Sequence, residues 1–194
     1  MSKLITNAVR HTGASADSLT LDSGGGVTVP TGKFACPGTI IQVVTNTKTD
    51  TFSSTTKDAW TDITGATVAI TPSSSSNKVF VMFSFAYGAD AHHSVMNFRI
   101  VRSTSTAVSA VADASGGAGT FQSTTYGLRG MYDHNGGGFL TLSALNSPSS
   151  TSAETYKLQY YATQTATYYL NRGDVDSTSY GRGASTFTAM EVSA

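Results

Sequence analysis

The sequence is poor in charge, in cysteine and in the polar residues that favour helices. Only 12% of its 194 residues are charged, and 12 basic residues balance 12 acidic ones. Nucleic acids and anionic lipids are bound by clustered Lys and Arg, so this composition excludes both as main partners. No apolar run approaches the roughly 20 residues of a membrane-spanning helix. We therefore expect neither nucleic-acid binding nor membrane insertion.

The single cysteine, Cys36, has no partner for a disulfide within the chain. We expect it to be a small buried hydrophobe rather than a reactive thiol. The first ten residues lack the continuous apolar segment of a secretory signal. A chain with these properties is expected to fold in the reducing cytoplasm of the cell that makes it.

The residues that are abundant favour β-structure. The chain has 30 Thr, 26 Ser and 19 Gly, but only two Glu and six Lys. From residue 37 onward, strand-length segments alternate with turn residues. These segments are 39–44, 60–64, 66–71, 79–87, 95–102, 107–111, 138–145, 156–162, 167–171 and 185–192. Short strands at this spacing predict an all-β fold, a β-sandwich or jelly roll, over residues 37–194.

Several of these segments alternate between apolar and polar residues. In 95–101, Met96, Phe98 and Ile100 are predicted to face the core. In 156–160 the tyrosines and the leucine are predicted to face the core, opposite Lys157 and Gln159. Segment 79–87 is apolar on both faces, which indicates a central strand that is covered on both sides, either by its own second sheet or by a subunit interface. The lone tryptophan, Trp60, is expected to start a strand and to lie in the core.

Residues 1–36 differ from the rest and are predicted to form an attachment arm. The alternation at 19–21 and 27–29, on either side of three glycines, predicts a small β-hairpin. A two-stranded ribbon is marginal in water, so the arm needs a partner surface. The predicted docking residues are Leu4, Ile5, Val9, Arg10, Leu19 and Leu21.

Sequence signatures of catalysis are missing. The chain has no nucleophile elbow, no His-Glu-x-x-His and no phosphate-binding glycine loop, and its two glutamates are far apart. We therefore expect a protein that is not an enzyme and that needs no cofactor or metal. The close carboxylates Asp174 and Asp176 allow a calcium site, but a solvated turn paired with Arg172 is favoured.

Aromatic residues near glycine-rich segments are the better functional candidates. Flat rings on loops can stack on sugar faces, and loops vary without disturbing a sandwich. The candidate receptor-binding residues are Tyr126, Tyr132, His134 and Tyr180. The alternative is that these side chains complete the edges of the core.

Several stretches resemble tail-fibre-like virion structural proteins of marine and cyanobacterial bacteriophages. The stretches lie near the N-terminus, in the first half of the sandwich and near the C-terminus: 4–11, 14–21, 41–44, 47–52, 62–65, 70–79, 146–148, 155–159, 170–172 and 185–192. They consist of strand and turn residues, so they identify a kind of protein rather than a site. Segment 90–138 matches nothing and is where individual specificity is expected.

The resemblance implies a phage structural protein that is assembled in the bacterial cytoplasm and carried on the virion, usually as a homotrimer. Its arm would dock onto other virion proteins, and its knob would bind host surface polysaccharide, with avidity from several copies. The alternative is a capsid decoration or cement protein, or a short head fibre that bridges shell subunits. The sequence contains no repetitive shaft between arm and knob, which favours this alternative.

Overall fold

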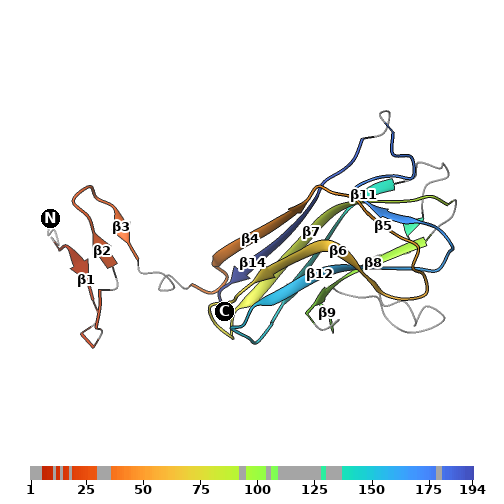
Figure 1. The fold of residues 1–194 in the computed structure, drawn as a ribbon. Helices are drawn as coiled ribbons and strands as arrows, with labels where there is room; N and C mark the ends of the chain where they lie inside the picture. Colours follow the sequence, from red (N-terminus) through yellow and green to blue (C-terminus); the bar gives the residue numbers. More distant parts are fainter. Residues whose placement is uncertain are drawn as a thin grey trace.

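The computed structural model describes residues 6–10, 12–13, 15–17, 19–29, 36–91, 95–103, 106–108, 128–129, 137–177 and 181–194. All regular elements over these ranges are β-strands, which confirms the all-β prediction (Figure 1). None of the described segments forms a helix of the length and apolarity that crossing a bilayer requires.

The N-terminal region forms a small antiparallel sheet of three strands, in the order β1-β2-β3. The strands are β1 (Ala8–Val9), β2 (Leu19–Leu21) and β3 (Val27–Thr28). The β2–β3 turn is stabilised by the Asp22 carboxylate, which accepts hydrogen bonds from the backbone N–H groups of Gly24 and Gly26. The predicted hairpin is therefore confirmed, and β1 adds a strand that the sequence did not indicate.

The remaining strands form two antiparallel sheets (Figure 1). The first sheet has the order β4-β14-β7-β11, and β13 and β5 extend it beside the end of β7. The second has the order β6-β12-β8, with β9 and β10 paired to β8. Their bounds are β4 (Ile40–Lys48), β5 (Phe52–Ser54), β6 (Thr61–Ile70), β7 (Lys78–Ala89), β8 (Val95–Arg102), β9 (Thr106–Ala107), β10 (Leu128–Arg129), β11 (Gly137–Asn146), β12 (Glu154–Ala162), β13 (Tyr168–Leu170) and β14 (Ser185–Val192). Consecutive long strands alternate between the two sheets, which is the wiring of a jelly roll.

The core fills the space between the two sheets, as the alternation predicted. Met96, Phe98 and Ile100 of β8 are buried against side chains from the first sheet. The rings of Phe85 and Phe98 meet edge-on across the sheets, with centroids 4.8 Å apart. Tyr156, Leu158 and Tyr160 of β12 are also fully buried. Most of the predicted segments became strands at or near their predicted bounds.

One pair of predicted strands is a single strand in the structure. Segments 60–64 and 66–71 are joined in β6 through Gly65, whose φ of 80° lies in the left-handed region. Beside it, the Asn46 amide of β4 donates to the carbonyl oxygens of Gly65 (3.3 Å) and Thr67 (2.7 Å). This exposed bridge ties one edge of the first sheet to the second sheet.

Two predictions about single residues are wrong. Cys36 is exposed, because it lies in the segment that leads into β4 rather than between the sheets. Trp60 is half-buried and outside the core. Its ring lies 4.1 Å from the Arg99 guanidinium carbon and meets Tyr161 edge-on at 5.5 Å. A cation–π contact on the outer face of the second sheet therefore holds this side chain.

The first and last strands of the sandwich are direct neighbours. β4 pairs with β14 over nearly its whole length. Beyond the pairing, the Gly38 N–H donates to the Ser193 carbonyl, and the Ser193 N–H donates to the Thr39 carbonyl, both at 2.9 Å. The chain thus enters and leaves the sandwich at the same place.

Candidate functional site

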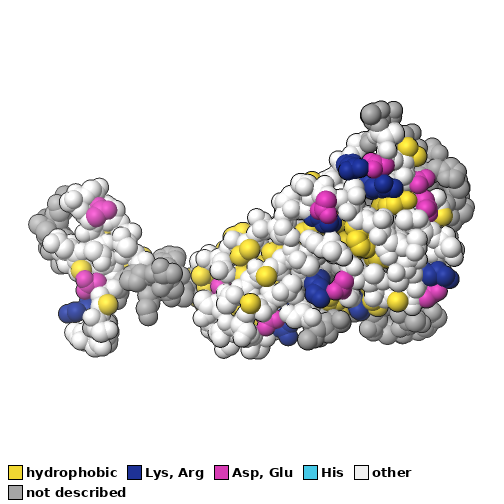
Figure 2. Space-filling model, viewed as in Figure 1, with side chains coloured by type: hydrophobic (Ala, Val, Ile, Leu, Met, Phe, Trp, Pro, Cys, Tyr) yellow, Lys and Arg dark blue, Asp and Glu magenta, His cyan; other side chains and the backbone are white. Residues whose placement is uncertain are grey.

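The outer face of the first sheet is uncharged over much of its length, and one row of its side chains is apolar. The register places its side chains in rows that cross four strands. Successive rows are Val43, Met190, Phe80 and Leu145; then Thr45, Thr188, Met82 and Ser143; then Thr47, Thr186, Ser84 and Thr141. These rows contain no charged residue, and Val43 and Leu145 are each 55% exposed. We call these rows the outer face. Figure 2 shows hydrophobic side chains over the end of the sandwich where β4 and β14 run.

Segment 79–87 contributes to the outer face because its apolar residues point to both sides of the sheet. Val81 and Phe83 point into the core, whereas Phe80 and Met82 point outward, and Met82 is 36% exposed. The strand is central, with β11 on one side and β14 and β13 on the other. The predicted central position of segment 79–87 is therefore confirmed. That a neighbouring subunit covers its outward side stays a prediction. Contiguous exposed apolar side chains of this kind mark association surfaces.

The arm also presents an apolar face. Val9 lies opposite Leu19, and Leu21 lies opposite Val27, so the register places all four side chains on one side of the small sheet. Val9 is 46% exposed and Val27 is 59% exposed. We call these four residues the arm face. The structure thus brings together three of the predicted docking residues and adds Val27.

The other predicted docking residues do not join the arm face. Arg10 lies beside Asp17, with 3.9 Å between the guanidinium Nε and a carboxylate oxygen, and both side chains are exposed. Leu4 and Ile5 lie outside the described residues, as do the predicted receptor-binding residues Tyr126, Tyr132, His134 and Tyr180.

A cleft of about 530 Å³ lies at the end of β7 near Ala86, between the sheet and the described residues of the β13–β14 loop, 171–177 and 181–184. Some of the glycines that line it leave no room for a side chain. A Cβ at Gly138 would lie 2.8 Å from the Tyr87 hydroxyl oxygen, and one at Gly183 would lie 2.7 Å from the Ala86 Cβ. The ring of Phe139, 66% exposed, is part of its lining.

Asn171 anchors the loop that forms one wall of this cleft. It is fully buried, with a φ of 64° in the left-handed region. Its side-chain amide donates to the carbonyl oxygens of Lys48 (2.8 Å) and Asp50 (2.9 Å), and its Oδ1 accepts from the Ser185 hydroxyl. Its own carbonyl accepts from the Gly183 N–H at 2.9 Å, so the two ends of the loop are closed together.

Two arginines in this loop converge on one carboxylate. Arg182 donates through Nε to Asp176 Oδ1 at 2.9 Å and through Nη2 to Oδ2. Arg172 donates to Oδ2 at 3.3 Å, and its guanidinium carbon lies 4.1 Å from the centre of the Tyr169 ring. We call these three residues the arginine clamp. The predicted pairing of this turn with Arg172 is confirmed. Figure 2 shows basic and acidic side chains side by side at this loop.

Charge pairing keeps the Asp176 carboxyl of the arginine clamp ionised. Hydrogen bonds from Arg182, together with the charges of both arginines, lower the pKa of the Asp176 carboxyl below its usual value. The Arg172 Nη2 also donates to the Asp174 backbone carbonyl at 3.4 Å. Over the part of the chain that the structure describes, no group of three or more His, Cys, Asp or Glu is placed to hold a metal ion.

Local sequence patterns indicated only one part of this cleft, the turn that pairs with Arg172. Gly137 and Phe139 are far from that turn in the chain. Only the pairing of β11 with β7 brings Gly137 and Phe139 beside the loop.

No protein-family model matches this chain. No curated protein matches it either. Among solved structures, the chain is similar to the VP2 subviral particle of infectious bursal disease virus, at 15% identity and a TM-score of 0.37, over 79% of this chain and 38% of that chain. It is similar to the Gx strain of the same virus at 15% identity and a TM-score of 0.37, over 79% and 36% of the two chains. The chain therefore spans less than half the length of these proteins, and a likeness at this level carries no argument about function.

Proposed function

We propose that this chain is a tail-fibre-like structural protein of a bacteriophage virion. In this proposal it assembles as a homotrimer through the outer face, docks onto the particle through the arm face, and binds host surface glycan through the sandwich. The sequence resemblance supports the kind of protein, and the two unpartnered apolar faces support assembly.

The outer face is the observation that carries the proposal. A second copy of the chain is the favoured occupant, because a face without charge offers nothing to a charged partner and matches another uncharged face. Hydroxyl rows beside an apolar row supply the mixture of apolar contact and hydrogen bonding that is typical of subunit interfaces. Three copies on one particle would turn weak glycan contacts into durable attachment.

Placing a charge on the outer face is expected to break the assembly. Met82→Glu would bury an uncompensated carboxylate in every interface, so association should weaken at least tenfold, or about 1.4 kcal/mol. Light scattering after size-exclusion chromatography should give about three times the 20.1 kDa chain mass for the unmodified protein and a shift towards one chain for the variant.

Ala69→Glu is the matched control, because Ala69 is an exposed residue of β6 in the other sheet. It should leave the mass unchanged. A monomeric unmodified protein, or equal masses for Met82→Glu and the unmodified protein, would contradict assembly through the outer face.

Charges on the arm face are expected to keep the protein off the particle. The double variant Leu21→Asp with Val27→Asp should reduce incorporation at least tenfold, because the apolar contact that docks the arm is lost. The control places the same two charges on the other side of the same sheet, with Thr20→Asp and Thr28→Asp, and should incorporate normally. Immunoblots of purified particles measure the difference, and equal incorporation of the two double variants would refute docking through this face.

A second candidate function is decoration of the capsid shell. The sequence favours it because no repetitive shaft separates the arm from the sandwich. Cryo-electron microscopy of the particle separates the two functions. Threefold density on the tail supports the tail-fibre-like function, whereas copies tiling the shell would replace it with decoration.

A further inference from the structure

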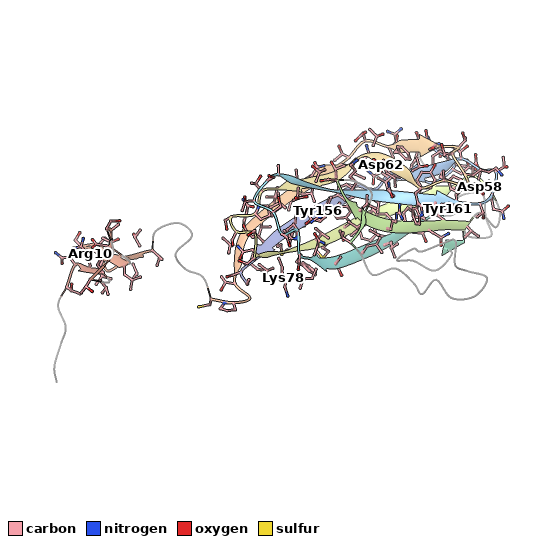
Figure 3. The ribbon with its side chains drawn as sticks, turned by 90° about the horizontal axis from the view of Figure 1, so that it is seen from below. Arg10, Asp58, Asp62, Lys78, Tyr156 and Tyr161 are labelled. Atoms are coloured by element: carbon pink, nitrogen blue, oxygen red, sulfur yellow. The ribbon has the colours of Figure 1, made fainter. Side chains whose placement is uncertain are left out.

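The cleft lies towards the opposite end of β7 from the apolar row of the outer face, and it adjoins the third row, because Ala86 of its lining is two residues beyond Ser84. Phe80 belongs to the apolar row, and Ala86 lines the cleft six residues later. At about 3.3 Å per residue these positions are roughly 20 Å apart. Figure 3 shows Lys78, the first residue of β7, at one end of the sandwich and Asp58 at the other. Subunits joined through the apolar row can therefore leave the cleft open to a ligand.

The lining of the cleft combines two cations with an aromatic ring. Arg172 and Arg182 line it, whereas Asp176, which joins them, is not part of the lining. The loop as a whole is neutral, because Asp174 and Asp176 balance the two arginines, but the surface that faces the cleft is cationic. Asp176 accepts two of the five N–H donors of Arg182 and holds its guanidinium in place.

These groups have the chemistry of a site for an anion that also has an apolar surface. Guanidinium groups recognise carboxylates through paired N–H donors, and a guanidinium that is already held in position loses little entropy on binding. The ring of Phe139 is mostly exposed, so its face is available for stacking. The volume of the cleft, about 530 Å³, falls within the range of small-molecule sites.

We propose that this cleft binds a carboxylate-bearing sugar, such as a uronic or sialic acid residue of a surface polysaccharide. The carboxylate lies against the guanidinium groups of Arg172 and Arg182, and the sugar ring stacks on Phe139. This inference rests on the proposed function, because it names the class of glycan that the sandwich binds. Of the predicted receptor-binding residues, Tyr180 belongs to the same connection before β14, whereas Tyr126, Tyr132 and His134 precede β11 in the chain.

The test measures binding of single sugars to the full chain by saturation-transfer NMR. Glucuronate, galacturonate and N-acetylneuraminate are compared with glucose, galactose and N-acetylglucosamine at equal concentrations. At least one acidic sugar is expected to bind at least fivefold more tightly than its neutral counterpart. Neutral sugars that bind as well as the acidic ones, or an absence of binding by every sugar, would overturn the proposal.

Variants then locate the binding. Arg182→Gln should weaken acidic-sugar binding at least tenfold, Arg182→Lys should restore part of it, and Phe139→Ala should weaken it about fivefold. Lys78→Gln removes the same charge from the far end of β7 and should change nothing. Equal affinities for Arg182→Gln and Lys78→Gln would overturn the site. So would a tetraglutamate peptide that binds more tightly than every sugar, because the cleft would then be a protein-docking site.

Light scattering of the same samples measures the mass of the assembly, so it tests trimer formation independently of sugar binding in the cleft. A trimer that binds no acidic sugar removes the cleft proposal and leaves the assembly proposal intact. A monomer that binds acidic sugar through Arg182 supports the cleft and contradicts assembly through the outer face.

Discussion

Replacing Asn171 by alanine is expected to lower the free energy of unfolding by about 3–4 kcal/mol. The substitution removes both N–H donors from the carbonyl oxygens of Lys48, which is buried, and Asp50, and it removes the acceptor of the buried Ser185 hydroxyl. Each buried group left without a partner costs about 1–3 kcal/mol. Alanine also adopts the left-handed backbone conformation less readily than asparagine does.

The chain contains a matched control in Asn46. Its side-chain amide also donates to two carbonyl oxygens, but the site is exposed, so water replaces the lost bonds. We expect Asn46→Ala to cost about 1 kcal/mol or less. Urea unfolding measures both variants. Equal losses of stability in the two variants would contradict a role for burial at Asn171. Asn171→Asp keeps the shape of the side chain but not its N–H donors, so its free energy of unfolding should be close to that of the alanine variant.

Glu191→Ala is expected to cost about 3 kcal/mol near neutral pH. The Glu191 side chain is 1% exposed, and its Oε1 accepts hydrogen bonds at 2.7 Å from the Ser73 N–H, the Ser73 hydroxyl and the Asn77 amide. These bonds fasten the β6–β7 connection to β14. Glu191→Gln keeps an acceptor oxygen and should cost less, about 1–2 kcal/mol.

The same carboxylate makes stability depend on pH. Burial by itself raises the pKa of Glu191, but the hydrogen bonds from Asn77, Ser73 and Ser74 outweigh it, so the pKa lies below its ordinary value of 4.5. A folded-state pKa below the unfolded-state pKa means that this stability is fully present above about pH 5 and is lost as the pH falls through the folded-state pKa. Urea unfolding from pH 7 to pH 3 should show a shallower loss for Glu191→Gln than for the unmodified protein. Glu154→Gln, which changes the only other glutamate, is the control, and parallel curves for Glu191→Gln and the unmodified protein would contradict this assignment.

The strands could be predicted because alternation and turn residues are local signals. Met96, Phe98 and Ile100 are buried as the period of two requires, and β8 and β14 have the predicted bounds. The predicted position of Trp60 was wrong because a large aromatic residue at the start of a strand is usually part of the core. Arg99, 39 positions away, provides its actual contact, and no local pattern records that pairing.

The candidate sites also differ in how far local sequence patterns predict them. The arm face and the outward side of β7 follow from alternation within single strands, so most of their residues were predictable. The cleft depends on segments that become neighbours only through the sheet pairing. Asn171, which closes its loop, resembles an ordinary turn residue in the sequence, and only its buried environment reveals its role.

Because β4 and β14 are neighbours, the sandwich is a self-contained unit whose two ends lie side by side. Because Gly38 and Thr39 are hydrogen-bonded to Ser193, the two points where the sandwich joins a host chain are separated by little more than one strand spacing. Such a unit can be grafted into a loop of another protein, or exchanged for a different knob on the same arm, without stretching the chain on either side. Recombination between genes could therefore exchange the sandwich while the N-terminal sheet stays the same.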